Sequence, residues 1–411
     1  MIDVHTHILP PPAQWPDFSE RFGYAGWVAL EAVAKGAGAC GCAKMLRVEQ
    51  GADGRAKLGA DGKRVVTFFR EIEANCWDAG ARIADMEAWE AGYLAHSEQS
   101  PPRSVGVPKC RMRQVLSTVP VMFGYWARPA DTLELSRWSN DHIAEACRAH
   151  PTRFVGLGTI PMNAPGLAVK ELERCVRELG FAGVQIGTNV NGRSIGEPEF
   201  FEVFAAAQEL DACVFVHPWE MLCGPPPTSQ EPAAERRGTQ MPKPPEMSPR
   251  LAKHWGAWLV GMPAETCLAM CSVVFGGMLE KLPRLRIGFA HGGGSFPGTI
   301  GRIDHGFHAR PDLCQTATKR SPRSWVREGD RTSAFFVDSL VHDAVALRML
   351  LDVIGPERIM LGSDYPFPLG EDRPGELILS IKDVPRPVQQ RMLSGTAMEF
   401  LGRAAKRLEV A

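Results

Sequence analysis

The sequence predicts an α/β protein that folds as a distorted (β/α)8 barrel, a TIM-type barrel with irregular loop insertions. Short β-rich runs recur along the chain, and helical stretches lie between them. Continuous apolar runs such as CVFV and IGFA are typical of strands that are buried on both faces, as in parallel sheets. Eight such runs match the strand number of this barrel, and in order they read MIDVH, QVLSTVP, RFVGLGTIP, GFAGVQIGT, CVFVHPW, RIGFAHGGG, AFFVDSL and RIMLGSDYP.

The structural alternative is a doubly wound sheet, and the positions of the polar residues favour the barrel. His5, His7, His217, His291 and Asp364 all fall at the C-terminal ends of their runs. The C-terminal face of a parallel barrel is the face on which active sites are built. A doubly wound sheet does not explain why these five residues share that position.

The helical stretches and the loops complete the predicted domain. The segment APGLAVKELERCVRELG has Pro165 and Gly180 where helix start and stop signals belong. Three other segments break the rhythm, and we expect each to be an insertion in a loop or at an element boundary, where extra chain costs little: residues 47–66, 91–112 and 224–249. The first carries the near-repeat GADGRAK and GADGKR, and the third carries eight prolines and is expected to be extended or disordered. Residues 1–411 are therefore expected to form one barrel domain.

Composition excludes several classes of function. The chain is 45% hydrophobic and 23% charged, and its formal net charge of -1 gives no basic excess for nucleic acid. Eleven cysteines without a CxxC pair, and without a preceding signal peptide, predict reduced thiols in a cytoplasmic protein. Cys213, Cys267 and Cys271 are expected to be free and buried. Apolar strand residues begin at Ile2, so no cleavable targeting sequence is expected.

The most apolar stretch, WGAWLVGMPAETCLAMCSVVFGGMLEKLP, does not predict a membrane span. Pro263 and Glu265 interrupt it and leave about fourteen residues of helix, which are too few to cross a bilayer. We expect a packed helix or a subunit interface here, and no membrane association.

The first strand and two later strands supply candidate metal ligands. In a strand the side chains at i and i+2 leave from the same face, so His5 and His7 in the HTH stretch can share one ion. His217 in VFVHPWE and Asp364 in LGSDYPFP reach the same end of the barrel. Three imidazoles and one carboxylate suit Zn²⁺ and leave one position for water. For each histidine alone, a hydrogen-bonded core residue is the commoner case, and only the combination predicts a metal.

His291 in FAHGGGSFP follows the sixth strand at the same face, where it suits a base beside the metal rather than a ligand. The alternative is a polar side chain that fills a gap next to a tight glycine turn. The fourth strand reads GVQIGT and offers Gln185, with no carboxylate or lysine to bridge two metals. One metal ion per subunit is therefore expected.

The sequence resembles the aminocarboxymuconate-semialdehyde decarboxylase family of the amidohydrolase superfamily. The similar stretches run nearly end to end: HTHILP, RFGYAGWV, NCWD, LSTVPVMFGYWA, RFVGLGTIPM, GVQIGT, FVHPW, WLVGMPAET, FAHGGGSFP, HGFHARPDLC and GSDYPFPLGE. The resemblance implies a distorted barrel with one zinc ion, an active homodimer, and a decarboxylation in tryptophan and kynurenine catabolism. It carries the metal ligands onto His5, His7, His217 and Asp364, and the base onto His291.

The resemblance also implies which residues hold the substrate, a small dicarboxylate. It carries the two family arginines onto Arg70 and onto Arg310, which in the family reaches into the neighbouring subunit's site. Guanidinium forks hold carboxylates better than ammonium groups do, although an isolated arginine is more often a surface ion-pair partner. By the same resemblance, four residues are expected to line the pocket, although core packing would explain them equally well: Trp219, Met221, Trp258 and Phe367.

Three rival functions share this metal set. A zinc decarboxylase of a hydroxybenzoate would not need the pair Arg70 and Arg310. A metal-dependent hydrolase of an amide or lactone would use the same activated water. A zinc-binding relative without catalytic activity would retain the ligands but would not consume the substrate.

Overall fold

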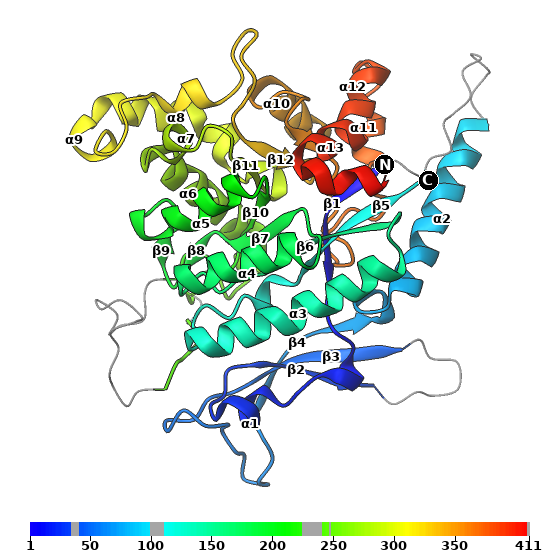
Figure 1. Cartoon of the computed structure of the whole chain (residues 1–411), viewed down its shortest axis with the longest axis vertical. Coiled ribbons are helices and arrows are strands. Elements are labelled where there is room, and N and C mark those ends of the chain that lie inside the picture. Colours follow the sequence, from blue (N-terminus) through cyan, green and yellow to red (C-terminus); the bar gives the residue numbers. More distant parts are fainter. Residues whose placement is uncertain (34–40, 99–110, 224–240, 246–247, 409–411) are drawn as a thin grey trace.

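The computed structural model describes residues 1–33, 41–98, 111–223, 241–245 and 248–408, and it confirms the predicted barrel. Within these residues one sheet holds eight parallel strands in the order β1-β5-β6-β7-β10-β11-β12-β13 (Figure 1). The strands are β1 (Ile2–Ile8), β5 (Arg113–Thr118), β6 (Phe154–Gly158), β7 (Gly183–Gly187), β10 (Cys213–His217), β11 (Arg286–Phe289), β12 (Phe336–Asp338) and β13 (Ile359–Met360). These are the eight runs that the sequence predicts as strands.

The chain that follows β13 closes the barrel against β1. The backbone N–H of Val4 donates to the carbonyl of Leu361 at 2.9 Å, and the N–H of Asp364 donates to the carbonyl of His5 at 2.8 Å. The first and last strands of the barrel are therefore neighbours, which brings residue 364 beside the histidines of β1.

Helices cover the outside of the barrel, so the strands are buried on both faces as their apolar runs predict. Val184 and Val214 of neighbouring strands, for example, belong to the same apolar core as Leu172 and Phe204 of the covering helices. The helices of this layer are α2 (Ala79–Glu98), α3 (Pro129–Ala149), α4 (Pro165–Arg177), α5 (Phe201–Glu209), α6 (Met262–Phe275), α7 (Met278–Lys281), α8 (Phe296–Ala309), α9 (Pro311–Cys314), α10 (Ala344–Val353), α11 (Glu376–Ser380), α12 (Arg386–Gln390) and α13 (Thr396–Leu401). The predicted helix start at Pro165 is confirmed, and Gly180 lies just beyond the helix end with a φ of +69°.

An antiparallel three-stranded sheet interrupts the series of β–α units between β1 and β5, and the sequence did not predict it. It follows a short helix, α1 (Phe18–Phe22), and consists of β2 (Val28–Ala32), β3 (Cys42–Val48) and β4 (Val66–Glu73). In Figure 1 it lies beside one end of the barrel. Its strands mix apolar with polar and charged residues, as in CAKMLRV of β3 and VTFFREIE of β4, so they lack the continuous apolar runs by which buried barrel strands are predicted. A two-stranded hairpin, β8 (Asn189–Val190) with β9 (Arg193–Ser194), is a second small addition.

The three expected insertions fall partly outside the described residues. Residues 47–66 continue β3 and lead into β4 through two similar turns, one for each copy of the near-repeat. In both turns an aspartate accepts the backbone N–H two residues later, Asp53 from Arg55 and Asp61 from Lys63. Residues 91–98 belong to α2, whereas residues 99–110, 224–240 and 246–247 lie outside the described chain. That the three segments are insertions remains a prediction.

The apolar stretch forms a longer helix than expected. Pro263 is the second residue of α6, and a π-helical turn, Ala257–Gly261, leads directly into α6, so the helix continues through the proline. The expected interruption at Pro263 and Glu265 is therefore wrong. In the described part of the chain one helix, Ala257–Phe275 with 19 residues, is long and apolar enough to cross a bilayer by length and composition, and 44% of its most apolar window is buried. Buried core helices pass the same test.

The cysteines agree with the prediction of free thiols. Nine cysteines in the described residues are free, and Cys213 is buried in β10. Cys267 and Cys271 are only half-buried, because they lie on the outer side of α6.

Candidate active site

Four side chains from three parts of the barrel meet at its C-terminal end. His5 and His7 leave β1, which is buried over its whole length. His217 is the last residue of β10, and Asp364 lies just after β13. Because parallel strands end at the same face of a barrel, the fold brings together all four ligands that the sequence predicts.

The distances between these side chains are those of a compact cluster. The Nε2 atoms of His5 and His7 lie 3.3 Å and 3.0 Å from Oδ1 of Asp364, and Nε2 of His217 lies 4.0 Å from it. Exposure is 2% or less for the three histidines and 8% for Asp364. Burying four polar groups this close together costs folding free energy unless they are paired or bind an ion. The cluster therefore suggests a binding site.

The outer nitrogen of each imidazole is already bound. Nδ1 of His7 donates to the carbonyl of Thr118 at 2.9 Å, and Nδ1 of His217 donates to the carbonyl of Pro218 at 2.9 Å. Nδ1 of His5 lies 2.7 Å from Oδ2 of Asp338. Because carbonyl and carboxylate oxygens only accept hydrogen bonds, these partners place a proton on Nδ1.

The inner nitrogens of the same histidines have no hydrogen-bond partner among the described residues, although they are buried. Metal-binding histidines show this arrangement, in which one ring nitrogen is fixed by an outer acceptor and the other faces the ion. Three imidazole nitrogens and one carboxylate oxygen are a donor set for a divalent transition metal such as Zn²⁺. The residues present therefore fit a metal ion.

The electrostatics of the cluster agree with this donor set. Burial, with the neighbouring histidines, holds the pKa of His217 well below its usual value, and burial lowers the pKa of His7. Burial alone would raise the pKa of Asp364, but the surrounding histidines hold it well below its usual range. Burial would lower the pKa of His5, yet Asp364 and Asp338 raise it to about 10. A positive charge is thus favoured here, and a metal ion would displace the proton.

His291 lies beside the cluster, as the sequence predicts. It follows β11, and its Nε2 is 3.8 Å from Oδ2 of Asp364. Its ligand atom lies within 4.8 Å of those of His5, His217 and Asp364. The chain turns sharply here, with left-handed φ angles at His291 (+56°) and at the three glycines that follow it. This turn brings the imidazole back over the end of the barrel.

An open pocket of about 570 Å³ leads to the cluster. His7, His217 and Asp364 form part of its wall, and three of the four predicted lining residues are present: Trp219, Trp258 and Phe367. Met221 does not line this pocket, because it is buried in a small apolar cluster with Ala257 and Met262. Core packing therefore accounts for Met221, and its place in the pocket stays a prediction.

Arg70 is the cation of the pocket. It lies on β4 of the three-stranded sheet, and its guanidinium lies over the ring of Phe367 at 4.6 Å from the ring centroid. Burial lowers the pKa of Arg70, while Asp364 acts in the opposite direction. The pocket therefore combines part of the metal-type cluster with a guanidinium within flat aromatic walls, a combination that suits a small planar anion.

Comparison with known proteins agrees with the fold and this site. The family model described as amidohydrolase matches residues 2–403. The chain belongs to the amidohydrolase family. The 2-amino-3-carboxymuconate-6-semialdehyde decarboxylase of Dictyostelium discoideum is 44% identical to this amidohydrolase over 401 residues, which cover 98% of this chain and 91% of the relative. The protein of the same name from Caenorhabditis elegans is 34% identical over 449 residues, with 97% and 94% coverage.

A solved structure confirms the architecture of this amidohydrolase. The 5-carboxyvanillate decarboxylase of Novosphingobium aromaticivorans, solved with bound manganese, superposes with a TM-score of 0.62. It is 23% identical and covers 80% of this chain and 82% of its own. At this identity the likeness concerns the fold alone.

Arg310 is not brought into the pocket of its own chain. It lies between α8 and α9, is exposed, and forms an ion pair with Asp312 at 2.6 Å. Arg310 of this amidohydrolase therefore lies outside its own pocket, and its role across a subunit interface stays a prediction.

Two residues that the sequence analysis missed lie close to the site. Asp338 ends β12 and holds the ring of His5. The same reasoning that singled out the other strand ends could have found it, because the run AFFVDSL carries this aspartate at its C-terminal end. Arg47 could not have been found this way, since it lies on β3 of the unpredicted sheet.

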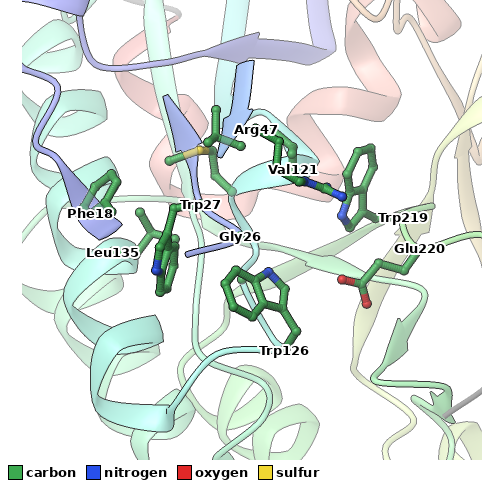
Figure 2. A pocket seen from close by; sticks show the side chains of 12 residues that line it. Phe18, Gly26, Trp27, Arg47, Val121, Trp126, Leu135, Trp219 and Glu220 are labelled. Atoms are coloured by element: carbon green, nitrogen blue, oxygen red, sulfur yellow. The ribbon is translucent and has the colours of Figure 1, made fainter. Parts of the chain in front are cut away.

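Arg47 and Glu220 face a second, smaller pocket behind Trp219 (Figure 2). Figure 2 shows Arg47 extending past Val121 towards the indole of Trp219. The carboxylate of Glu220 lies below Trp219 in this view. The Nε atom of Arg47 has no hydrogen-bond partner among the described residues. Burial raises the pKa of Glu220 to about 7, although Arg47 acts against it. Trp219 lines both pockets and so separates this pair from the metal-type cluster.

Proposed function

We propose that this amidohydrolase catalyses the non-oxidative decarboxylation of 2-amino-3-carboxymuconate 6-semialdehyde to 2-aminomuconate 6-semialdehyde, a step of tryptophan and kynurenine catabolism. The observation that carries the proposal is one pocket that Arg70 lines together with His7, His217 and Asp364 of the metal-type cluster, with His291 beside Asp364. Two relatives of this name, 44% and 34% identical over nearly the whole chain, support the choice of substrate.

The proposed metal is one zinc ion per subunit, held by His5, His7, His217 and Asp364. Three imidazoles and one carboxylate suit zinc, although the structural neighbour was solved with manganese. When bound, the ion supplies Lewis acidity and stabilises negative charge that develops on the reacting groups.

Arg70 binds and orients one carboxylate of the substrate. Its planar fork can form two parallel charge-assisted hydrogen bonds, and the ring of Phe367 below it limits the directions in which the fork can turn. Trp219 and Trp258 line the flat walls of the pocket and exclude water from the conjugated chain of the substrate.

His291 moves the proton that the reaction requires. Protonation of the carbon that bears the leaving carboxylate interrupts the conjugation of the substrate. The bond between this carbon and the carboxylate then breaks, CO₂ departs, and the electron pair of that bond restores the conjugated enamine. The proton stays on this carbon in place of the lost carboxylate, so the net reaction consumes one proton, releases one CO₂ and needs no organic cofactor. The position of His291 beside Asp364 supports this role as acid and base.

We further propose that the active form is a cytoplasmic homodimer in which Arg310 reaches the partner's pocket. Its exposure and its place outside its own pocket support this. Exposed apolar side chains on the long helix support an interface as well, notably Leu259, Val260 and Leu268 with 52%, 63% and 53% exposure. The exposed and half-buried positions of this helix come in pairs four residues apart, at 259/260, 263/264, 267/268 and 271/272. These pairs therefore form one stripe along the helix.

The test is to mix the purified protein with freshly prepared aminocarboxymuconate semialdehyde while absorbance and released CO₂ are followed. We expect loss of the substrate absorbance with one CO₂ per molecule consumed. The variant His291→Ala should retain the metal ion and lose turnover by about 10²- to 10⁴-fold. Normal turnover in His291→Ala would contradict the proposed proton carrier.

The same assay separates the rivals. A hydroxybenzoate decarboxylase would release CO₂ from 2,6-dihydroxybenzoate instead, and a hydrolase would cleave an amide or lactone and release no CO₂. A protein that binds one zinc ion and consumes none of these substrates would be a relative without catalytic activity, and the proposal would fail.

A further inference from the structure

Asp338 contacts both halves of the proposed catalytic machinery. It is fully buried at the end of β12. Oδ2 lies 2.7 Å from Nδ1 of His5 and also accepts the backbone N–H of His291 at 3.0 Å. Oδ1 accepts the N–H groups of Gly292 at 2.8 Å and Leu340 at 3.1 Å. One carboxylate therefore receives four hydrogen bonds, from a ligand ring, from the turn that carries His291, and from its own loop.

The contact with His5 differs from those of the other two predicted ligands. The rings of His7 and His217 are oriented by main-chain carbonyls, which persist whatever side chains surround them. Nδ1 of His7 also lies 3.3 Å from Oγ of Ser117, but among these three histidines only His5 is oriented by a carboxylate. Which nitrogen of the His5 ring carries the proton, and which faces the metal position, therefore depends on the side chain at residue 338.

The contact with the turn fixes the position of His291. The left-handed backbone at His291 is unfavourable for a residue with a side chain, and a partner must hold it. Its N–H and that of Gly292 point at the same carboxylate, as in the backbone concavities that bind anions. Asp338 thus compensates for the strain that places the imidazole over the cluster.

The packing around Asp338 permits this approach because residue 362 is a glycine. A Cβ atom at Gly362 would lie 2.6 Å from the Cβ of Asp338 and 2.9 Å from that of His5. Real Cβ atoms do not come so close, so a larger residue would push these two side chains apart. The absence of a side chain at residue 362 therefore allows His5 and Asp338 to lie next to each other.

We propose that Asp338 is a positioning residue that couples metal binding to proton transfer. It keeps the His5 ring in the form whose Nε2 faces the metal position, and through the backbone of the following turn it holds His291 over the same position. This inference rests on the proposed function for the role of His291. Its metal-binding half does not depend on the substrate.

The test compares Asp338→Asn with Asp3→Asn. An asparagine has one acceptor oxygen, so it cannot satisfy four donors, and its amide can donate to Nδ1 of His5 and reverse the ring's protonation pattern. Asp3 is an equally buried carboxylate in β1 that accepts from Ser363 and from the backbone N–H of His5 but does not contact the ring. It therefore controls for the replacement of a buried, hydrogen-bonded carboxyl group by an amide.

Two measurements are made on folded protein, checked by circular dichroism and thermal melting. The first is the zinc affinity of the metal-free protein, determined by competition with a chromophoric chelator. We expect Asp338→Asn to lose about 10- to 100-fold in affinity and Asp3→Asn to lose less than about threefold. The second is turnover at saturating zinc, where Asp338→Asn should lower kcat at least about tenfold. Its KM should stay within about threefold of the parent value, because Arg70 is untouched.

Parental zinc affinity in Asp338→Asn would overturn the proposal, as would equal losses in the two variants. Weak zinc binding with a normal kcat at saturating zinc would overturn the coupling. If Asp338→Asn does not fold, Asp338→Ser, which leaves room for water, is measured against the same limits. If the protein consumes no substrate at all, the proposed function fails, while the zinc affinities still decide whether Asp338 orients His5.

Discussion

Replacement of Arg70 tests how the pocket recognises its substrate. In this structure Arg70 is the only guanidinium among the described residues that line the pocket leading to the metal-type cluster, and Phe367 restricts its orientation. We expect Arg70→Ala to lower kcat/KM strongly while the metal ion stays bound, because Arg70 contacts none of the predicted ligands through a hydrogen bond or ion pair.

The magnitude follows from the hydrogen bonds that the side chain can form. A hydrogen bond to a charged group contributes about 1.5–3 kcal/mol, and two parallel bonds share one desolvation cost. A loss of about 3 kcal/mol corresponds to roughly 150-fold in kcat/KM. Arg70→Lys keeps a point charge without the fork, so a loss of about 1.4 kcal/mol, or roughly tenfold, is expected.

The assay is steady-state decarboxylation over a range of substrate concentrations, with zinc content measured in the same samples. Arg348→Ala is the matched control, since Arg348 is exposed and forms an ion pair with Asp383 on the outside of the barrel. The reasoning is refuted if Arg70→Ala keeps kcat/KM within about threefold of the parent value, or if Arg348→Ala causes the same loss.

Two further predictions concern the second pocket and the dimer. Because the pKa of Glu220 is raised to about 7 in the folded protein, the folded state binds more protons than the unfolded state between about pH 4.5 and 7, and this contribution to stability is lost as the pH rises. The free energy of unfolding of Glu220→Gln should therefore rise by about 2–3 kcal/mol relative to that of the parent between pH 5 and pH 8, measured by urea denaturation, and a difference that does not vary with pH would contradict this. For the dimer, inactive Arg310→Ala and His291→Ala proteins, mixed after subunit exchange, should regain up to about a quarter of parental activity, because one site of each mixed dimer has both residues intact. No recovery despite verified exchange would exclude a role of Arg310 across the interface.

The barrel and its metal-type cluster could be predicted from the sequence because their signals are local. His5 and His7 sit two residues apart on an apolar run, and His217 and Asp364 each end another such run. The parallel arrangement of the strands does the rest, since it brings these ends to one face. The helix over Ala257–Phe275 was predicted less well, because Pro263 was expected to interrupt it, whereas a π-helical turn precedes the proline and the helix continues through it.

The residues that were missed depend on contacts between distant parts of the chain. The run AFFVDSL marks Asp338 as a strand-end residue, but its contact with His5, 333 positions away in sequence, cannot be predicted from this run alone. Met221 shows the opposite case, in which a residue close to His217 in sequence turns away into an apolar cluster. Proximity in sequence to a ligand therefore does not predict a place in the pocket.

The structure separates the chemistry from the recognition of the substrate. All the residues proposed for the chemistry come from strand ends of the barrel, namely the predicted metal ligands, His291 and Asp338. The solved structure that is 23% identical shares this barrel as a fold. The cations near the pocket, Arg47 and Arg70, come instead from the added sheet. In that sheet Met45 pairs with Arg70, and the register between β3 and β4 shifts between Met45 and Leu46. Such an irregularity re-aims side chains, and here it lies at the strand position that carries Arg70 into the pocket. A change in this sheet could therefore alter which acid is bound without disturbing the atoms that cleave the carbon–carbon bond.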